Sequence, residues 1–344
     1  MRAAVYNAPF DVSLGERPDP VIQSQGDAIV RVSATCVCGS DLWYYRGDSK
    51  RKGGGPIGHE FVGVVEEVGA EVTTVRVGDF VIAPFMWSDG TCPHCLHGIT
   101  SSCVHGGFWG SQGADGGQGE YVRVPEANGT LVVVPGGVPD ARLIPSLLAL
   151  SDVCGTGHHA AVGAGVIPGS TVAVVGDGAV GLCGVLAARR LGAERIIALS
   201  RNPARQLIAT EFGATDLIAA RGDDAVAAVL ELTDGVGVDA TLECVGTAQA
   251  FSTAFAIARP GSRVGFVGVP HGVEVPIHAA FDNNVGLGGG LAPVRAYLPA
   301  LLADVLSGAI NPGLVFDYEF DLADIGEAYK AMDERRAIKA IARL

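Results

Sequence analysis

The chain has 344 residues, of which 48% are hydrophobic and 18% charged, so it has enough apolar material for about two folded domains and too much for a disordered protein. Asp and Glu number 37 against 24 Lys and Arg, and this net charge of −13 argues against nucleic acid or an anionic membrane surface as a partner, because both require basic patches. The chain has neither a leader pattern nor a long apolar run, so we expect a cytoplasmic protein that binds no membrane.

The first part of the chain, residues 1–145, contains short apolar runs separated by turn residues. Val, Ile and Phe recur within the runs, and Gly, Pro, Asp and Asn bound them, which is typical of short strands. We predict strands over 28–33, 61–68, 80–83, 121–124 and 131–134. Such a succession of strands favours a β-barrel or sandwich-like domain.

The pattern changes near residue 168. Predicted strands now alternate with predicted helices, which indicates a parallel sheet with crossover helices. The strands are 171–175, 195–199, 238–243 and 262–267, and the helices are one ending near 191, 203–212 and 248–258.

The tail changes again, with predicted helices over 297–306 and 325–335 and an extended segment over 314–320. We expect this tail to return to the first domain. The predicted organisation is therefore one domain over 1–145, completed by 293–344, and a second domain over 146–292.

A glycine-rich loop follows the strand predicted at 171–175 and opens the next helix. A G-x-G-x-x-G pattern in this context predicts dinucleotide binding, because its glycines permit a tight turn, close approach of the pyrophosphate and packing of helix on strand. The helix N-terminus then stabilises the phosphate charge. A glycine-rich turn without a ligand is the alternative. The loop residues are Gly176, Asp177, Gly178, Ala179, Val180 and Gly181.

The end of the next strand bears on the choice of dinucleotide. An NAD site normally has Asp or Glu there, about 20 residues after the glycines, to accept the ribose 2′-hydroxyl. This chain has Ser200, followed by Arg201 and Arg205. Because a small hydroxyl and guanidinium groups suit a 2′-phosphate, we predict preference for NADP(H). The alternative is that both arginines belong to a solvated helix start.

Cysteine and histidine motifs in the first domain suit a metal. Cys38-Gly39-Ser40-Asp41 and Gly58-His59-Glu60 supply a thiolate and an imidazole, which are ligands that zinc prefers. Together with the glycine-rich loop, these motifs resemble the zinc-dependent medium-chain alcohol dehydrogenases. The resemblance extends over nearly the whole chain, and it includes the Gly78-Asp79-Phe80-Val81 turn and the Thr156-Gly157-x-His159 stretch. It implies an α/β fold with a GroES-like β-barrel catalytic domain and a doubly wound, parallel-sheet Rossmann domain.

The resemblance implies a catalytic zinc on Cys38, His59 and Asp152. The family's third ligand lies four residues before the threonine of the T-G stretch, where this chain has Asp152 instead of the Cys of many members. Cys154 is nearby at the wrong spacing. An Asp at this position is similar to the tetrameric bacterial secondary-alcohol dehydrogenases, which use NADP.

Three further side chains take roles from the resemblance. Glu60 resembles the carboxylate near zinc that coordinates transiently, and Asp41 is expected to orient His59 through its second ring nitrogen. Ser40 resembles the hydroxyl that takes the alcohol proton. Ordinary loop polarity is the alternative for Asp41 and Glu60.

A second cysteine cluster resembles the family's structural zinc loop, whose four cysteines have the spacing C-x2-C-x2-C-x7-C. The first position is an aspartate here, so the expected ligands are Asp89, Cys92, Cys95 and Cys103. A carboxylate can bind zinc, and a mixed site of this kind should be weaker or more labile. His94 and His97 are substitutes within the loop, and a metal-free loop with reduced thiols is the alternative.

The proton relay departs from the family pattern. Many members place a His five residues after the first zinc ligand, where this chain has Trp43. The relay would then run from Ser40 through the cofactor ribose to water. Trp43, Trp87 and Trp109 either line a substrate pocket or pack in the core.

These residues predict a zinc-dependent enzyme that transfers a hydride between NADP(H) and a small-molecule alcohol, aldehyde or ketone. A polyol, sugar-alcohol or amino-alcohol dehydrogenase of the same superfamily is the alternative, and a non-catalytic nucleotide-binding protein is disfavoured by the intact Cys38, Ser40, His59 and Asp152. The resemblance implies a homodimer or homotetramer. The apolar, glycine-rich stretch 264–290 is a candidate subunit contact.

Overall fold

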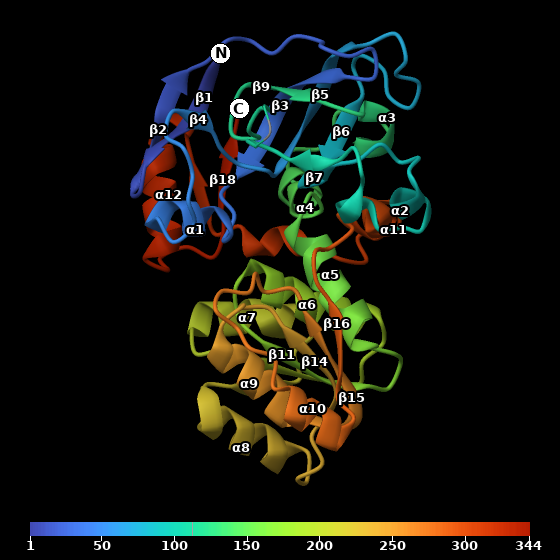
Figure 1. Cartoon of the computed structure of the whole chain (residues 1–344), viewed down its shortest axis with the longest axis vertical. Helices are drawn as coiled ribbons and strands as arrows, with labels where there is room; N and C mark the ends of the chain where they lie inside the picture. Colours follow the sequence, from blue (N-terminus) through green and yellow to red (C-terminus); the bar gives the residue numbers. More distant parts are fainter. Residues whose placement is uncertain (112) are drawn as a thin grey trace. The chain divides into compact units, whose positions relative to one another are not determined.

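A computed structural model describes residues 1–111 and 113–344, which form two compact units (Figure 1). Unit 1 contains Met1–Asp152 and Pro293–Leu344, and unit 2 contains Val153–Ala292. The first division falls at Asp152 and not at 145, because helix α4 (Ile144–Ala149) packs on strands β3 and β5 of unit 1.

Unit 1 is built on a seven-stranded sheet in the order β10-β6-β5-β3-β18-β17, with β9 also paired to β3. The C-terminal tail supplies β17 and β18, and β18 runs antiparallel to β3 with Ile341 opposite Cys36. The tail is therefore part of the first unit's sheet. The strands are β3 (Ala28–Cys36), β5 (Phe61–Val68), β6 (Phe80–Ala83), β9 (Tyr121–Val124), β10 (Val132–Val133), β17 (Tyr318–Phe320) and β18 (Ala340–Arg343).

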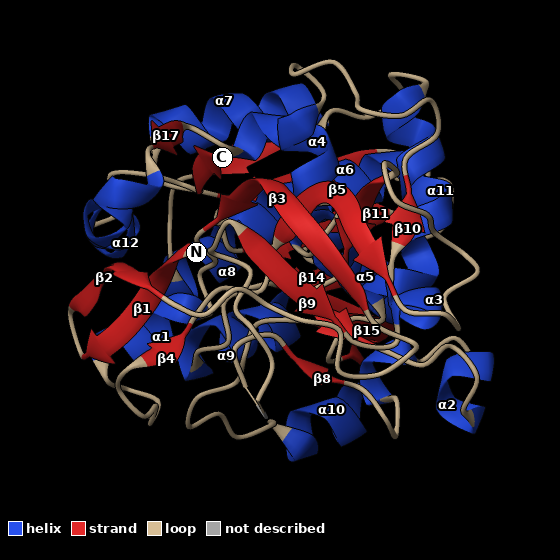
Figure 2. Ribbon diagram, turned by 90° about the horizontal axis from the view of Figure 1, so that it is seen from above, coloured by secondary structure: helices blue, strands red, loops and turns tan. Residues whose placement is uncertain are grey.

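Smaller elements complete unit 1. A three-stranded sheet has the order β2-β1-β4, and β7 pairs with β8. Figure 2 shows β3 and β5 side by side and helix α12 beside the β1–β2 pair. The strands are β1 (Arg2–Ala8), β2 (Asp11–Glu16), β4 (Gly55–Pro56), β7 (Met86–Trp87) and β8 (Gly107–Phe108), and the helices are α1 (Asp41–Arg46), α2 (Pro93–Leu96), α3 (Ala127–Thr130), α11 (Val294–Leu306) and α12 (Ile325–Asp333), with short 3-10 turns η1 (Thr100–Ser102), η2 (Pro312–Val315) and η3 (Leu322–Asp324).

One predicted element of the tail is partly wrong. The segment predicted as extended over 314–320 begins inside the 3-10 turn η2, and only β17 is a strand. Pro312 fixes its own φ near the helical range. The backbone N–H of Gly313 donates to Ser146 Oγ at 3.1 Å, and a side chain at Gly313 would collide with the Ser146 backbone. Close packing on α4 therefore bends the chain here.

Unit 2 contains a six-stranded sheet in the order β13-β12-β11-β14-β15-β16, with every pair parallel. This confirms the doubly wound parallel sheet predicted from the alternation of strands and helices. Helices α5 and α6 pack together and on the sheet, as do α8 and α9. The strands are β11 (Thr171–Val175), β12 (Arg195–Leu199), β13 (Asp216–Ile218), β14 (Val238–Glu243), β15 (Ala258–Phe266) and β16 (Gly286–Gly289), and the helices are α5 (Val153–Ala164), α6 (Ala179–Arg190), α7 (Pro203–Phe212), α8 (Gly222–Leu232), α9 (Ala248–Ile257) and α10 (Ile277–Asn283).

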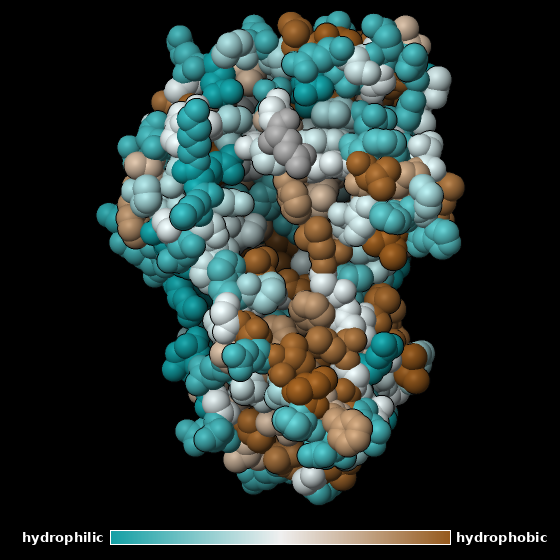
Figure 3. All heavy atoms as spheres, in the orientation of Figure 1, coloured by the Kyte–Doolittle hydropathy of each residue, from teal (hydrophilic) through white to brown (hydrophobic). Residues whose placement is uncertain are grey.

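Strand β16 is the edge of this sheet and pairs only with β15 among the described residues. Exposed apolar side chains surround it, and Figure 3 shows hydrophobic side chains gathered on this face of unit 2. We define the β16 edge by its exposed residues Val275, Ile277, Phe281, Leu287 and Leu291. Across the described ranges, no helix combines the length and apolar character of a membrane span.

Candidate active site

The sheet of unit 1 brings distant polar residues to one place. Cys38 follows the end of β3, and His59 and Glu60 precede the start of β5. These strands pair antiparallel with Thr35 opposite Phe61, so the end of one lies beside the start of the other. Asp152 joins them from the segment after α4.

Four metal-ligand side chains converge there. Atoms of Cys38, His59, Glu60 and Asp152 that can bind a metal all lie within 4.8 Å of one another. Asp152 Oδ2 is 3.6 Å from Cys38 Sγ and 3.4 Å from His59 Nε2. A thiol, an imidazole and a carboxylate around one point form a donor set that fits zinc.

Asp41 fixes the His59 ring. Its Oδ1 lies 3.2 Å from His59 Nδ1, and its Oδ2 accepts the backbone N–H of Cys38 at 3.0 Å. Donation from Nδ1 leaves the Nε2 lone pair for a metal. Burial lowers the pKa of His59, but Asp41 and Cys38 raise it by more, so the net shift is well upward. Burial and Glu60 raise the pKa of the Cys38 thiol.

Ser40 lies at the same cluster. Its hydroxyl is 3.4 Å from Cys38 Sγ and 3.4 Å from His59 Nε2. The hydroxyl can therefore exchange a proton with a group bound at this point. Trp43 lies on α1, and the Arg46 guanidinium is 5.9 Å from its ring centre.

Sequence reasoning missed a buried ion pair beside the cluster. Lys339 Nζ lies 2.6 Å from Glu60 Oε1 and also donates to the Val37 carbonyl at 3.3 Å. Burial raises the pKa of Glu60, and the Lys339 ammonium opposes this rise. Burial lowers the pKa of Lys339, but Cys36 and Glu60 outweigh it, and the net shift is well upward. One signal was available, because Lys339 is the only charged residue in the apolar run 337–342.

Two of the three tryptophans pack in the core. Trp87 and Trp109 are buried in the core of unit 1 with ring centres 5.3 Å apart, and each donates its ring N–H to a backbone carbonyl. Core packing therefore accounts for both, and the substrate-pocket prediction is corrected for them. Phe85 instead meets the His59 ring edge-on, with centres 6.3 Å apart, and was missed.

The second cluster also forms in unit 1. Ligand atoms of Asp89, Cys92, Cys95 and Cys103 all lie within 4.8 Å of one another. Asp89 Oδ1 accepts the backbone N–H groups of Thr91 and Cys92 at 2.8 and 2.9 Å. Burial raises the pKa of Cys92, but backbone donors from Cys95 and Val104 bring it down to about 7. A thiol that ionises near neutral pH is a suitable metal ligand.

Histidines near this loop have other partners. His105 Nδ1 lies 2.7 Å from Asp89 Oδ2, which sequence reasoning missed. His94 and His97, expected as substitute ligands, hydrogen-bond through Nδ1 to the carbonyls of Ser102 and Pro93. Within the described ranges, the cluster thus consists of one carboxylate and three thiols.

The glycine-rich loop connects β11 to α6 in unit 2. Gly176 has a φ of +116°, which favours glycine. A Cβ on Gly181 would lie 2.0 Å from the Gly176 carbonyl oxygen, so only glycine permits this close turn. A Cβ on Gly178 would meet no atom within 4 Å, so the space at the start of α6 is open. Open space at a helix N-terminus suits a phosphate group.

The end of β12 holds a cluster that the sequence did not reveal. Ser200 Oγ donates to Asp177 Oδ2 at 2.9 Å, and Arg205 Nη1 lies 3.3 Å from Asp177 Oδ1. Arg201 is exposed, and it makes no hydrogen bond or ion pair within the described part of the chain. A carboxylate from the glycine-rich loop therefore lies where the strand end supplies none.

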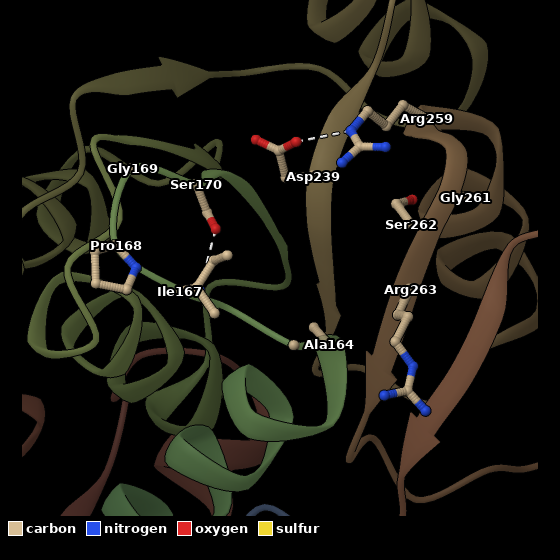
Figure 4. Close-up of a pocket in the computed structure, with 11 residues that line it drawn as sticks. Ala164, Ile167, Pro168, Gly169, Ser170, Asp239, Arg259, Gly261, Ser262 and Arg263 are labelled. Carbon is tan, nitrogen blue, oxygen red and sulfur yellow. Dashed lines mark hydrogen bonds and ion pairs between the residues drawn. The ribbon is translucent and has the colours of Figure 1, made fainter.

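Unit 2 also has a cavity of about 360 Å³ at the opposite edge of its sheet (Figure 4). Ser170 precedes β11, Asp239 lies near the start of β14, and Arg263 lies in β15. Asp239 is paired there with Arg259, whose Nε lies 2.7 Å from its Oδ1. The glycine-rich loop follows the carboxyl ends of the strands, so this cavity is separate from it.

Fold and site define a class of two-domain oxidoreductases that use a metal and a dinucleotide. Residues 24–136 match the alcohol dehydrogenase GroES-like domain family, and residues 179–301 match the zinc-binding dehydrogenase family. The chain therefore belongs to the zinc-dependent medium-chain alcohol dehydrogenase family. It is an oxidoreductase that uses Zn²⁺ and a nicotinamide dinucleotide, with a GroES-like domain and a Rossmann domain.

Individual relatives agree over nearly the whole chain. A zinc-type alcohol dehydrogenase B from Aspergillus flavus is 35% identical, and the match covers 99% of this chain and 81% of the relative. The structure of alcohol dehydrogenase TADH from Thermus sp. ATN1 has a TM-score of 0.91 and 34% identity, covering 100% and 99% of the two chains. A sorbitol dehydrogenase from Bacillus subtilis is 30% identical over 95% of this chain and 92% of its own.

Proposed function

We propose that the protein interconverts an alcohol and the corresponding aldehyde or ketone with NADP(H), using zinc held by Cys38, His59 and Asp152. The convergence of these three ligand side chains supports the proposal most directly. Cys38, His59 and Asp152 would hold the zinc, and a zinc with three protein ligands would keep an open position for the substrate oxygen. When bound, zinc acts as a Lewis acid on that oxygen and the dinucleotide carries the hydride.

The chain's own residues orient ligands and move the proton. Asp41 holds the His59 ring with its Nε2 directed at the cluster. Ser40 receives the alcohol proton in oxidation and returns it in reduction. Trp43 stands where many family members have a relay histidine, so the ribose of a bound dinucleotide would supply the next hydroxyl for the proton on its way to water. Lys339 holds Glu60 beside the cluster through their ion pair, and Glu60 Oε2, which has no hydrogen-bond partner among the described residues, is available to the metal.

NADP(H) is proposed as the dinucleotide because β12 ends without an acidic residue. Ser200 stands there, and the exposed Arg201 offers an unengaged cation for a 2′-phosphate. Asp177 provides a contrary observation, because its carboxylate would accept the 2′-hydroxyl of NAD(H). Cofactor choice is therefore an essential arm of the test below.

The substrate class has a second candidate. The B. subtilis sorbitol dehydrogenase favours a polyol, whereas the apolar Phe85 beside His59 favours an alcohol with an apolar substituent. We propose the latter. We also propose that Asp89, Cys92, Cys95 and Cys103 hold a structural zinc, whose donor set the cluster matches.

The β16 edge is the proposed contact in a homodimer or homotetramer. An edge strand exposes unpaired backbone groups, and apolar side chains flank it here. The variant Leu287→Arg should shift the molecular mass in light scattering towards the monomer. The same change at the exposed Val138 of unit 1 should leave the mass unchanged. A monomeric wild-type protein would contradict the proposal.

Zinc content and turnover test the function together. The purified protein is analysed for metal and assayed with aliphatic and aromatic alcohols, ketones, aldehydes and polyols, with NADP(H) and NAD(H) in parallel. Turnover of alcohols or carbonyls with NADP(H) is expected. Turnover of polyols alone would favour the second candidate, and zinc-loaded protein without turnover on any substrate would contradict the catalytic proposal.

A further inference from the structure

We propose that the Asp177 carboxylate is a specificity determinant that opposes Arg201: it accepts the ribose 2′-hydroxyl of NAD(H) and withholds Arg205 from the 2′-phosphate of NADP(H), so the preference for NADP(H) is weaker than Ser200 and the two arginines alone would give. This assignment rests on the proposed dehydrogenase function for the identity of the ligand. It differs from the sequence-based expectation, in which Ser200, Arg201 and Arg205 all favour NADP(H).

The position follows from the register of two parallel strands. Val175, the last residue of β11, is paired with Leu199, the last residue of β12. Asp177 and Ser200 follow these strand ends, so both lie at the carboxyl edge of the sheet. Dinucleotides bind at this edge in doubly wound folds, with the adenosine ribose near the end of the second strand.

The contacts show that Arg205 is already engaged. Its Nη1 lies 3.3 Å from Asp177 Oδ1 and donates to the Asp177 carbonyl at 3.2 Å. The residue is only 9% exposed, which holds the guanidinium against the loop. Its charge is therefore balanced by a carboxylate before any ligand arrives. A 2′-phosphate would have to compete with Asp177 for it.

The carboxylate also has a favourable role with NAD(H). Asp177 Oδ2 accepts the hydroxyl of Ser200 at 2.9 Å, which orients the group at the strand end. A carboxylate oxygen accepts further hydrogen bonds, and bonds to a charged acceptor are stronger than neutral ones. A ribose 2′-hydroxyl finds such an acceptor here, whereas a phosphate with about two negative charges is repelled.

Of the two arginines that follow β12, Arg201 is the one that Asp177 does not engage. It is exposed at the start of the segment leading to α7, and it has no ion pair among the described residues. The site thus presents one unengaged cation and one carboxylate whose charge Arg205 balances. Removing the carboxylate would release a second cation for the phosphate.

Fragment binding tests this without zinc or substrate turnover. The dissociation constants of adenosine 2′,5′-bisphosphate and of AMP are measured by calorimetry on the purified wild-type protein and on Asp177→Asn. The variant should bind the bisphosphate about tenfold more tightly relative to AMP, in line with one hydrogen bond to a charged group. Asp177 is not at a positive φ, so Asp177→Ser is a second variant with the same expected direction.

The matched control is Asp234→Asn. Asp234 is exposed and follows α8 at the opposite edge of the sheet. Its substitution therefore removes the same charge without changing the contacts of Asp177. For Asp234→Asn, the ratio of the dissociation constants of adenosine 2′,5′-bisphosphate and AMP should stay at the wild-type value. Thermal melting confirms that each variant is folded.

The outcomes separate the two proposals. If the wild type binds both fragments and both Asp177 variants leave their ratio within twofold of wild type, the role of Asp177 is overturned while dinucleotide binding stands. If the ratio shifts as expected but no substrate is turned over, the role of Asp177 in dinucleotide specificity is supported and the proposed activity is refuted. If neither fragment binds to the wild type, both proposals are overturned.

Discussion

Lys339 and Glu60 form an ion pair in which both side chains are buried, with 2.6 Å between Lys339 Nζ and Glu60 Oε1. The two residues lie 279 positions apart in the chain, so the pair ties the C-terminal tail to the metal-ligand loop. Two charges in an apolar interior are stable only together, because each would otherwise be desolvated without compensation.

Removal of one partner should therefore be costly. Lys339→Met leaves a buried, uncompensated carboxylate, and we expect a loss of about 3–5 kcal/mol in the free energy of unfolding. Urea denaturation measures it. The double variant Lys339→Met/Glu60→Gln should recover part of the loss. Lys330→Met removes an exposed lysine and is the control. A single variant as stable as the control would show that the pair is not required.

The catalytic zinc ligands give the second prediction. Cys38→Ala removes a thiol that lies 3.6 Å from Asp152 Oδ2, so zinc binding and turnover should fall to near background. Circular dichroism and fluorescence titration with NADPH should show a folded protein that still binds the dinucleotide. The control Cys183→Ala, at a buried cysteine outside both clusters, should keep its zinc. Near-normal turnover of Cys38→Ala would refute the assignment of the ligand.

The cysteine loop should contribute stability and not catalysis. Metal binding there couples to local folding, so Cys95→Ser should lower the melting temperature and remove one zinc per chain. Turnover at a temperature well below melting should persist. Elemental analysis of the wild type is expected to give two zinc ions per chain. A fully active wild type with a single zinc would exclude the structural site.

The sequence predicted what local patterns determine. The apolar runs at 171–175 and 195–199 became β11 and β12 with the predicted bounds, because buried parallel strands are continuous apolar runs. The hairpin of β1 and β2 was missed, because no strand was predicted there. The loop motif predicted nucleotide binding, since its glycines meet a local steric requirement.

The sequence alone did not predict contacts between residues that lie far apart in the chain. Lys339 reaches Glu60 only because β18 pairs with β3, and Asp177 reaches Ser200 only because β11 pairs with β12. The alternation of strands and helices predicted a parallel sheet, but the residue-by-residue register of these two pairs does not follow from spacing along the chain. For Trp87 and Trp109 the sequence left two alternatives, and burial in the core decided between them.

A pH dependence follows from Arg195 and Asp216, which connect β12 to β13 with Arg195 Nε 2.8 Å from Asp216 Oδ2. Hydrogen bonding to Arg195 lowers the pKa of Asp216 below its ordinary value. A lowered folded-state pKa gives stability that is present above about pH 4, the unfolded-state value, and is lost as pH falls through the folded-state value.

Asp216→Asn should therefore destabilise the protein at pH 7 and lose its effect in acid. The pair is partly exposed, so the expected difference at pH 7 is about 1 kcal/mol or less. Melting temperatures of wild type and variant should converge as pH falls below about 4. Asp48→Asn, at an exposed carboxylate of unit 1, should show no such convergence. A difference in melting temperature between wild type and Asp216→Asn that grows in acid would contradict the predicted direction of the pH dependence.

The last prediction concerns Arg201, the unengaged cation after β12. A hydrogen bond to a charged group is worth about 1.5–3 kcal/mol, so one contact with a 2′-phosphate should make NADP(H) bind roughly 10- to 100-fold more tightly than NAD(H). Arg201→Ala should raise the KM for NADPH by about that factor and barely alter the KM for NADH. Arg190→Ala, at a helix end of the same unit, is the control.

Ser200→Asp should go further and favour NADH. The new carboxylate would stand beside Asp177, which is 2.9 Å from Ser200 Oγ, and two negative charges there repel a phosphate more than one does. Steady-state kinetics with both dinucleotides measure the ratio of kcat/KM values. If Arg201→Ala raised the KM for NADPH and the KM for NADH by the same factor, Arg201 would not contact the 2′-phosphate. The proposed preference for NADP(H) would then lose its main support.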